Sequence, residues 1–87
     1  MAITKQLTIR NKLGLHARPA ALFVQLANKF DSEITVRKGK NEVNGKSIMG
    51  ILMLAAGKGS KICISAEGDD AEEALKELEK IILCDES

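Results

Sequence analysis

The segment Gly14-Leu15-His16-Ala17-Arg18-Pro19 contains the only histidine of the chain. Its glycine favours a loop, whereas Pro19 is compatible with the first turn of a helix, where a missing N–H is not needed. The start of a helix has unpaired N–H groups and partial positive charge, so it attracts anions. Both charge states of His16 are accessible near neutral pH, and the Arg18 guanidinium suits phosphate oxygens. The segment therefore predicts a nucleophilic imidazole beside an anion site.

A plainer interpretation treats His16 and Arg18 as solvated surface residues near a helix start. The register of that helix also stays open, because a residue before proline resists the helical conformation. The helix begins either at His16 or Ala17, or only after Arg18. It is expected to extend to Lys29, with one apolar face formed by Ala20, Phe23, Val24 and Ala27.

Alternating apolar residues predict four strands in the rest of the chain. These strands are Ile3–Arg10, Glu33–Lys38, Asn41–Asn44 and Lys61–Ala66. The turn Gly39-Lys40 joins the second and third strands into a hairpin.

Two more helices follow from capping signals. Ser47 stands at the N-cap position before an apolar run from Ile48 to Leu54. Asp69 or Asp70 is expected to cap the last helix, with Glu72 or Glu73 completing a capping box.

The order strand, helix, strand, strand, helix, strand, helix predicts a two-layer α+β fold, with helices on one side of an antiparallel sheet. The 87 residues suffice for a single domain, residues 1–87, with a core but no deep cavity. We therefore expect the chemistry to take place at the surface, under a docked partner.

Composition narrows the possible partners. The chain has 13 basic and 12 acidic residues and two aromatic residues, which argues against nucleic acid or an anionic membrane as the main partner. No segment resembles a signal peptide or a membrane span, so we expect a cytoplasmic location without membrane insertion. Cys63 and Cys84 lack metal-ligand spacing, and neither a metal site nor a disulfide is expected.

Ser47 and the residues after it form a second candidate site. A capping role alone explains the serine, but a phosphate placed there would meet the free N–H groups of a helix start. The next seven residues are apolar all around, although a two-layer fold buries only one helix face. Either loops bury the remainder, or exposed side chains form a docking surface, for which we name Ile48, Met49, Leu52 and Met53.

These segments together resemble the HPr/NPr family, the histidine-containing phosphocarriers of the bacterial phosphoenolpyruvate–sugar phosphotransferase system. The resemblance extends from about Ile3 to Ile82. It is carried by Gly14-Leu15-His16-Ala17-Arg18-Pro19-Ala20 and by Asn44-Gly45-Lys46-Ser47-Ile48-Met49-Gly50.

The resemblance implies an open-faced β-sandwich of βαββαβα order, with strand order 1-4-2-3 and three helices on one face. Enzyme I would phosphorylate the Nδ1 atom of His16, and IIA domains of sugar permeases would receive the phosphoryl group. Arg18 and the backbone N–H groups of Ala17 and Arg18 would steady that group. Ser47 would be the target of HPr kinase/phosphorylase, and a catabolite-control regulator would be a further partner.

The resemblance describes a carrier that needs no cofactor rather than an enzyme, and a monomer is the simpler form for a protein that docks with successive partners. It leaves open whether the system moves sugar or only regulates. The segment Asn11–Gly14, which precedes the histidine, is similar to the matching segment of nitrogen-branch members. The segment Lys46–Gly50 is similar to the matching segment of kinase-regulated members. His16 sets the chain apart from the catabolite-repression paralogue that lacks this histidine.

Two other classes of function compete with the carrier. In a regulatory protein-interaction module, His16 would not be phosphorylated, and the residues after Ser47 would only bind partners. In an enzyme, His16 would act as a general base on a small phosphorylated substrate, but no second acid–base group lies near it in the sequence.

Overall fold

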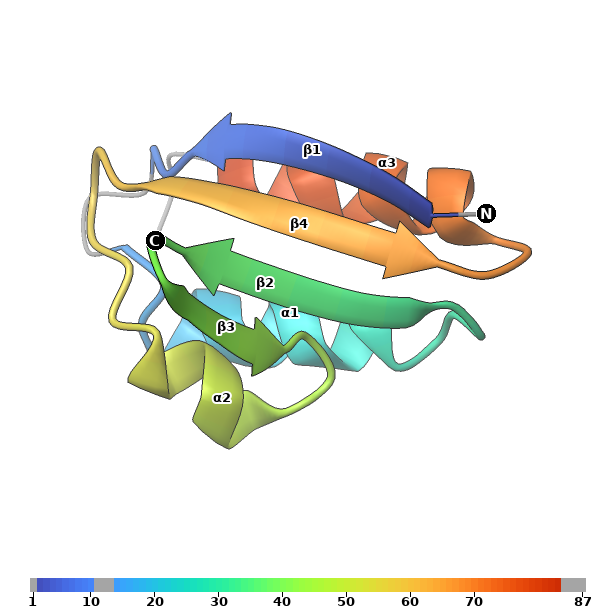
Figure 1. Ribbon diagram of the computed structural model, residues 1–87. Coiled ribbons are helices and arrows are strands. Elements are labelled where there is room, and N and C mark those ends of the chain that lie inside the picture. The colour runs from blue at the N-terminus through green and yellow to red at the C-terminus, as the bar shows by residue number, and fades with distance from the viewer. Residues whose placement is uncertain (1, 11–13, 84–87) are drawn as a thin grey trace.

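Four antiparallel strands form one sheet, and the helices lie against one of its faces (Figure 1). The computed structural model describes residues 2–10 and 14–83. The elements are β1 (Ala2–Thr8), α1 (Ala17–Ala27), β2 (Glu33–Lys38), β3 (Asn41–Asn44), α2 (Ile48–Met53), β4 (Lys61–Glu67) and α3 (Ala71–Leu83). The strand order is β1-β4-β2-β3, so the predicted open-faced α+β sandwich of βαββαβα order is confirmed. None of the described helices is long and apolar enough to cross a membrane.

The strand register separates an apolar face from a polar one. Ile64 of β4 pairs with Val36 of β2, and both side chains are buried beneath the helices. One position along β4, Ser65 pairs with Thr4 of β1, and their hydroxyl oxygens lie 2.9 Å apart. Because successive side chains of a strand point to opposite faces, the hydroxyl groups lie on the uncovered face of the sheet.

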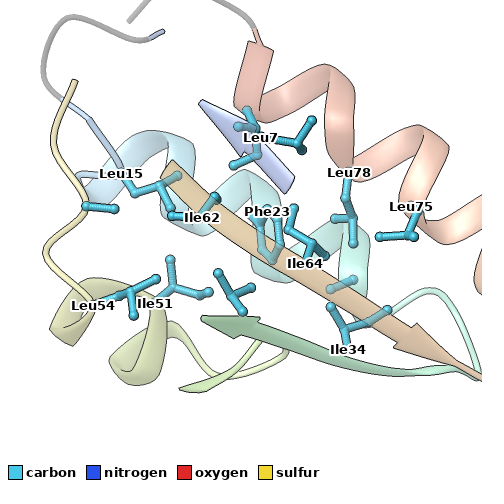
Figure 2. Packing of buried hydrophobic residues seen from close by; sticks show 14 of the residues in the cluster. Leu7, Leu15, Phe23, Ile34, Ile51, Leu54, Ile62, Ile64, Leu75 and Leu78 are labelled. Atoms are coloured by element: carbon cyan, nitrogen blue, oxygen red, sulfur yellow. The ribbon is translucent and has the colours of Figure 1, made fainter. Parts of the chain in front are cut away.

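The core is aliphatic around a single phenylalanine, Phe23 of α1 (Figure 2). The same cluster of buried residues includes Ile62 and Ile64 of β4, Leu78 of α3 and Ile51 of α2. Full burial of a side chain of this size contributes roughly 1.5–3 kcal/mol. This core fixes α1, and with it the segment around His16, against the sheet.

Several element bounds differ from the sequence prediction: β1 begins at Ala2 rather than Ile3, and β4 ends at Glu67 rather than Ala66. Strand β1 ends at Thr8 rather than Arg10, although the backbone of Ile9 still bonds to that of Gly59 and Ser60 at 2.9 Å in each case. Helix α1 ends at Ala27 rather than Lys29. In its last turn, the carbonyl of Val24 accepts from both the backbone N–H of Asn28 at 3.0 Å and the side-chain amide of Asn28 at 2.9 Å.

The open question about the start of α1 is settled in favour of the earlier register. His16 occupies the N-cap position, and its carbonyl receives the first helical hydrogen bond, from the Ala20 N–H at 2.9 Å. Arg18 is helical although it precedes proline, and Pro19 takes the third helical position. The amide hydrogen that proline lacks would have no intrahelical partner there.

The predicted capping box at α3 is wrong. Asp70 does precede the helix, and its carbonyl accepts from the Ala74 N–H at 2.9 Å. Its carboxylate, however, accepts from the N–H groups of Asp31 at 2.8 Å and Ser32 at 2.9 Å, and from the Ser32 hydroxyl. The side chain therefore joins two distant connections instead of capping its own helix.

Candidate functional site

His16 lies at the junction between the loop after β1 and the start of α1. Its backbone is extended, with φ −90° and ψ −171°, and its side chain does not cap the helix. The imidazole is half-buried, and its Nε2 atom is buried without a hydrogen-bond partner among the described residues.

The loop that carries His16 is docked onto the connection between α2 and β4. The Leu15 N–H donates to the Ala56 carbonyl at 2.8 Å. Gly14 has φ +74°, and a Cβ atom there would lie 2.3 Å from the Ala56 oxygen and 2.6 Å from the Gly57 Cα. Only glycine permits both this conformation and this close approach.

The first turn of α1 has the features of an anion site. The amides of Ala17 and Arg18 precede the first helical hydrogen bond, and no acidic residue lies in this turn. Both residues are exposed, so the Arg18 guanidinium can reach an anion held at the helix start. The structure thus places His16, Ala17 and Arg18 together, as their adjacency in the sequence predicts.

Ser47 is the N-cap of α2, and its Oγ accepts a hydrogen bond from the Gly50 N–H at 3.1 Å. The preceding residue is held by α1, because the Asn28 side-chain amide donates to the Lys46 carbonyl at 3.2 Å. In return, the Lys46 ammonium donates to the Phe30 carbonyl at 2.7 Å. The capping role predicted for Ser47 is confirmed.

Helix α2 exposes most of its apolar side chains, so loops do not bury them. Ile51 is fully buried, whereas Met49 is 64 % exposed and Met53 is 75 % exposed. Ile48 and Leu52 are exposed as well. These four exposed residues, Ile48, Met49, Leu52 and Met53, form what we call the α2 patch, at the end of the helix layer beside β3 (Figure 1).

Sequence reasoning missed other surface features. Leu22 of α1 is 52 % exposed and lines a shallow groove with Leu26 and, on α3, Ile81. Its position outside the predicted apolar face of α1 could have revealed this exposure. The thiol of Cys63 is free and lies on the open face of the sheet, with its Sγ 3.8 Å from an Arg37 nitrogen. Residues 11–13 and Cys84 lie outside the described part of the chain.

The described segments 2–10 and 14–83 hold no cluster of three or more histidine, cysteine, aspartate or glutamate side chains able to bind a metal ion.

Residues 3–83 match the model of a protein family described as the PTS HPr component phosphorylation site. The chain belongs to the HPr family. The match spans every strand and helix from β1 to α3 and includes both segments on which the sequence resemblance depended.

Curated relatives of two kinds are similar to this HPr-family chain. The HPr-like protein Crh of Halalkalibacterium halodurans is 53 % identical over 76 residues, which cover 87 % of this chain and 90 % of Crh. The phosphocarrier protein HPr of Neisseria meningitidis is 48 % identical over 80 residues, which cover 92 % of this chain and 90 % of that protein.

Solved structures support the same family and fold. The crystal structure of a phosphocarrier protein HPr from Bacillus anthracis superposes with a TM-score of 0.90 at 52 % identity, covering 93 % of this chain and 96 % of that one. Similar structures also include dimers of HPr and of Crh.

Proposed function

We propose that this HPr-family protein is a phosphocarrier that accepts a phosphoryl group on Nδ1 of His16. Enzyme I, charged by phosphoenolpyruvate, is the donor, and IIA domains of sugar permeases are the acceptors. The observation that carries this proposal is the position of the half-buried His16 at a helix start whose first two amides bond to none of the described residues, with an exposed arginine and no acid in the first turn.

The burial of Nε2 favours Nδ1 as the reacting atom. A lone pair on Nδ1 of the neutral ring attacks the phosphorus atom, and the bond that joins phosphorus to enzyme I breaks. The group of enzyme I that carried the phosphoryl group keeps the electron pair of that bond. Transfer to a IIA domain repeats the exchange, with His16 as the leaving group.

The surroundings of His16 support a transferable phosphoryl group rather than a tightly held one. The N–H groups of Ala17 and Arg18 and the Arg18 guanidinium would contact its oxygens. Because Ala17 and Arg18 are both exposed, water screens these contacts, and they stabilise the phosphoryl group only modestly. A carrier needs this modest stabilisation, since it must release the group to the next protein.

The α2 patch supplies the docking surface in this proposal. Exposed methionine side chains adapt to different partner surfaces, so one patch can serve both enzyme I and IIA domains. A phosphate on Ser47, added by HPr kinase/phosphorylase, would place negative charge at the edge of the patch and oppose docking. The same phosphate would create a feature that a catabolite-control regulator could recognise.

We further propose that residues 1–87 act as one domain and as a monomer in the cytoplasm. A monomer keeps the His16 end and the α2 patch free for successive partners. The protein changes no free substrate of its own, so it is a carrier and not an enzyme.

The decisive experiment measures the intact mass of the wild type and of His16→Ala after incubation with enzyme I and phosphoenolpyruvate. We expect one added phosphoryl group on the wild type, lost in acid, and none on His16→Ala. Arg18→Met serves as a second variant and should accept the group more slowly. Absence of added mass on the wild type, with an enzyme I that phosphorylates a control HPr, would refute the proposal.

The alternative function is a regulatory interaction module that is not coupled to sugar transport. The exposed α2 patch favours it, because such a patch binds partners without any chemistry at His16, and Crh proteins are among the relatives. This alternative predicts that His16→Ala leaves both partner binding and biological activity unchanged.

A further inference from the structure

We propose that Lys38 is a positioning residue for His16, acting through the connection between α2 and β4. The link from Lys38 to the His16 loop is a matter of geometry. Only its effect on phosphoryl transfer rests on the proposed function.

Lys38 is the last residue of β2, and its ammonium donates to the Ala55 carbonyl at 3.1 Å. Ala55 follows the C-cap residue of α2 and has φ +51°, a left-handed conformation that is unfavourable for any residue except glycine. The ammonium also lies at the C-terminal end of a helix, where a positive charge is favourable. Lys38 therefore stabilises a strained turn from outside it.

That turn is the surface on which the His16 loop docks. Ala56, the next residue, is buried, and its carbonyl accepts the Leu15 N–H at 2.8 Å. Gly14 lies against Ala56 and Gly57 with no room for a Cβ atom. A shift of the Ala55 carbonyl would therefore move the acceptor of Leu15, the residue that precedes His16.

The remaining anchors of this connection are bonds of the backbone. The Gly59 N–H donates to the Ile9 carbonyl at 2.9 Å, and the Ser60 N–H donates to the Gly57 carbonyl at 3.0 Å. Across residues 2–10 and 14–83, the bond from Lys38 is the one side-chain hydrogen bond that reaches residues 55–60. At the end nearest Leu15, the backbone supplies the bond from the Ala55 N–H to the Leu52 carbonyl at 3.2 Å, and Lys38 adds a second contact, on the Ala55 carbonyl.

Loss of the hydrogen bond from Lys38 to Ala55 should disturb the position of the His16 ring more than it lowers the free energy of unfolding. The Ala55 side of the turn is exposed, so water can replace the lost donor. The turn would then sample more conformations, and the His16 ring would spend less time in the geometry needed for transfer.

The test compares Lys38→Met, which keeps the apolar stem, with Lys38→Arg, which keeps a donor. Lys40→Met is the matched control, because Lys40 is exposed in the same hairpin turn. By NMR, we expect hydrogen exchange at the Leu15 amide to quicken about threefold or more in Lys38→Met only. In transfer from phospho-enzyme I, kcat should fall about threefold or more in Lys38→Met, with KM unchanged. Lys38→Arg should restore both values.

Equal Leu15 exchange in Lys38→Met and Lys40→Met would overturn the proposal. So would a raised KM with unchanged kcat, because Lys38 would then contact the partner instead of positioning His16. If the wild type is not phosphorylated, the proposed function fails, yet the exchange measurement still decides the role of Lys38.

Discussion

The carboxylate of Asp70 accepts a hydrogen bond from the main-chain N–H of Ser32, 38 positions earlier in the chain, at 2.9 Å. The hydroxyl of Ser32, a fully buried residue, donates to the same oxygen. The bond ties the connection between α1 and β2 to the start of α3. The Ser32 hydroxyl, followed by the Asp31 N–H, holds the pKa of Asp70 below its usual value.

This bond predicts how stability depends on pH. A carboxyl group whose pKa is lower in the folded state stabilises the fold above its unfolded pKa, about 3.9, and that stabilisation is lost as the pH falls through the folded value. We expect Asp70→Asn to lower the free energy of unfolding at pH 7 and to show a smaller loss between pH 5 and pH 2. Urea denaturation across this range measures both effects.

Asp69→Asn is the control, because Asp69 is exposed beside Asp70 and should behave as the wild type does. If Asp70→Asn lost as much stability in acid as the wild type, another carboxyl group would be responsible for the acid dependence.

Ser47 allows the charge of a phosphate to be separated from the capping bond. Asparagine and aspartate both cap a helix, so Ser47→Asn and Ser47→Asp should keep the bond to Gly50, whereas Ser47→Ala should lose about 1 kcal/mol of stability. Only Ser47→Asp adds negative charge beside the α2 patch. We expect weaker binding to enzyme I for Ser47→Asp than for Ser47→Asn, measured by calorimetry. Equal affinities would remove the charge argument for regulation.

The two faces of α2 should respond differently to truncation. Ile51 is fully buried, so Ile51→Ala should lower the free energy of unfolding by about 2–5 kcal/mol. Met53 is 75 % exposed, so Met53→Ala should change it by less than about 0.5 kcal/mol. Met53→Ala should still weaken binding to enzyme I and to a IIA domain. Full binding by Met53→Ala would place the docking surface elsewhere.

The elements of the fold were predictable because each depends on neighbours in the sequence. β2 and β3 have the bounds that alternation and the turn Gly39-Lys40 predict. Ser47 precedes α2 as its capping signal indicates. The exposure of the apolar side chains after it was one of two alternatives that the sequence left open, because loops could also have buried them. The full strand order came from the resemblance, because no local pattern determines that β4 lies between β1 and β2.

The contacts that the sequence did not reveal join distant residues. Nothing near Asp70 shows that its carboxylate bonds to Ser32, since a capping box was the locally available choice. Lys38 and Ala55 likewise meet only because β2 ends beside the C-terminus of α2. Such pairs depend on the completed tertiary structure, which the periodicity of single elements does not describe.

Gly14 offers a final test of how the His16 loop is positioned. Gly14→Ala combines two penalties: a positive φ of 74° and a Cβ atom 2.3 Å from the Ala56 oxygen, the acceptor of the Leu15 N–H. Gly39→Ala carries the first penalty alone, because φ is +60° and no atom lies within 4 Å of the added carbon. Gly39→Ala should therefore cost about 1–2 kcal/mol of stability, and Gly14→Ala clearly more.

The two glycine variants should also differ in the rate at which His16 is phosphorylated. Because the added methyl group displaces the Ala56 carbonyl, Gly14→Ala should slow phosphorylation of His16 about tenfold or more, even where it is fully folded. Gly39→Ala should be phosphorylated at the rate of the wild type. Mass spectrometry over a time course gives both rates, with folding checked by circular dichroism. A folded Gly14→Ala protein with a normal rate would show that the Leu15–Ala56 bond does not position the histidine.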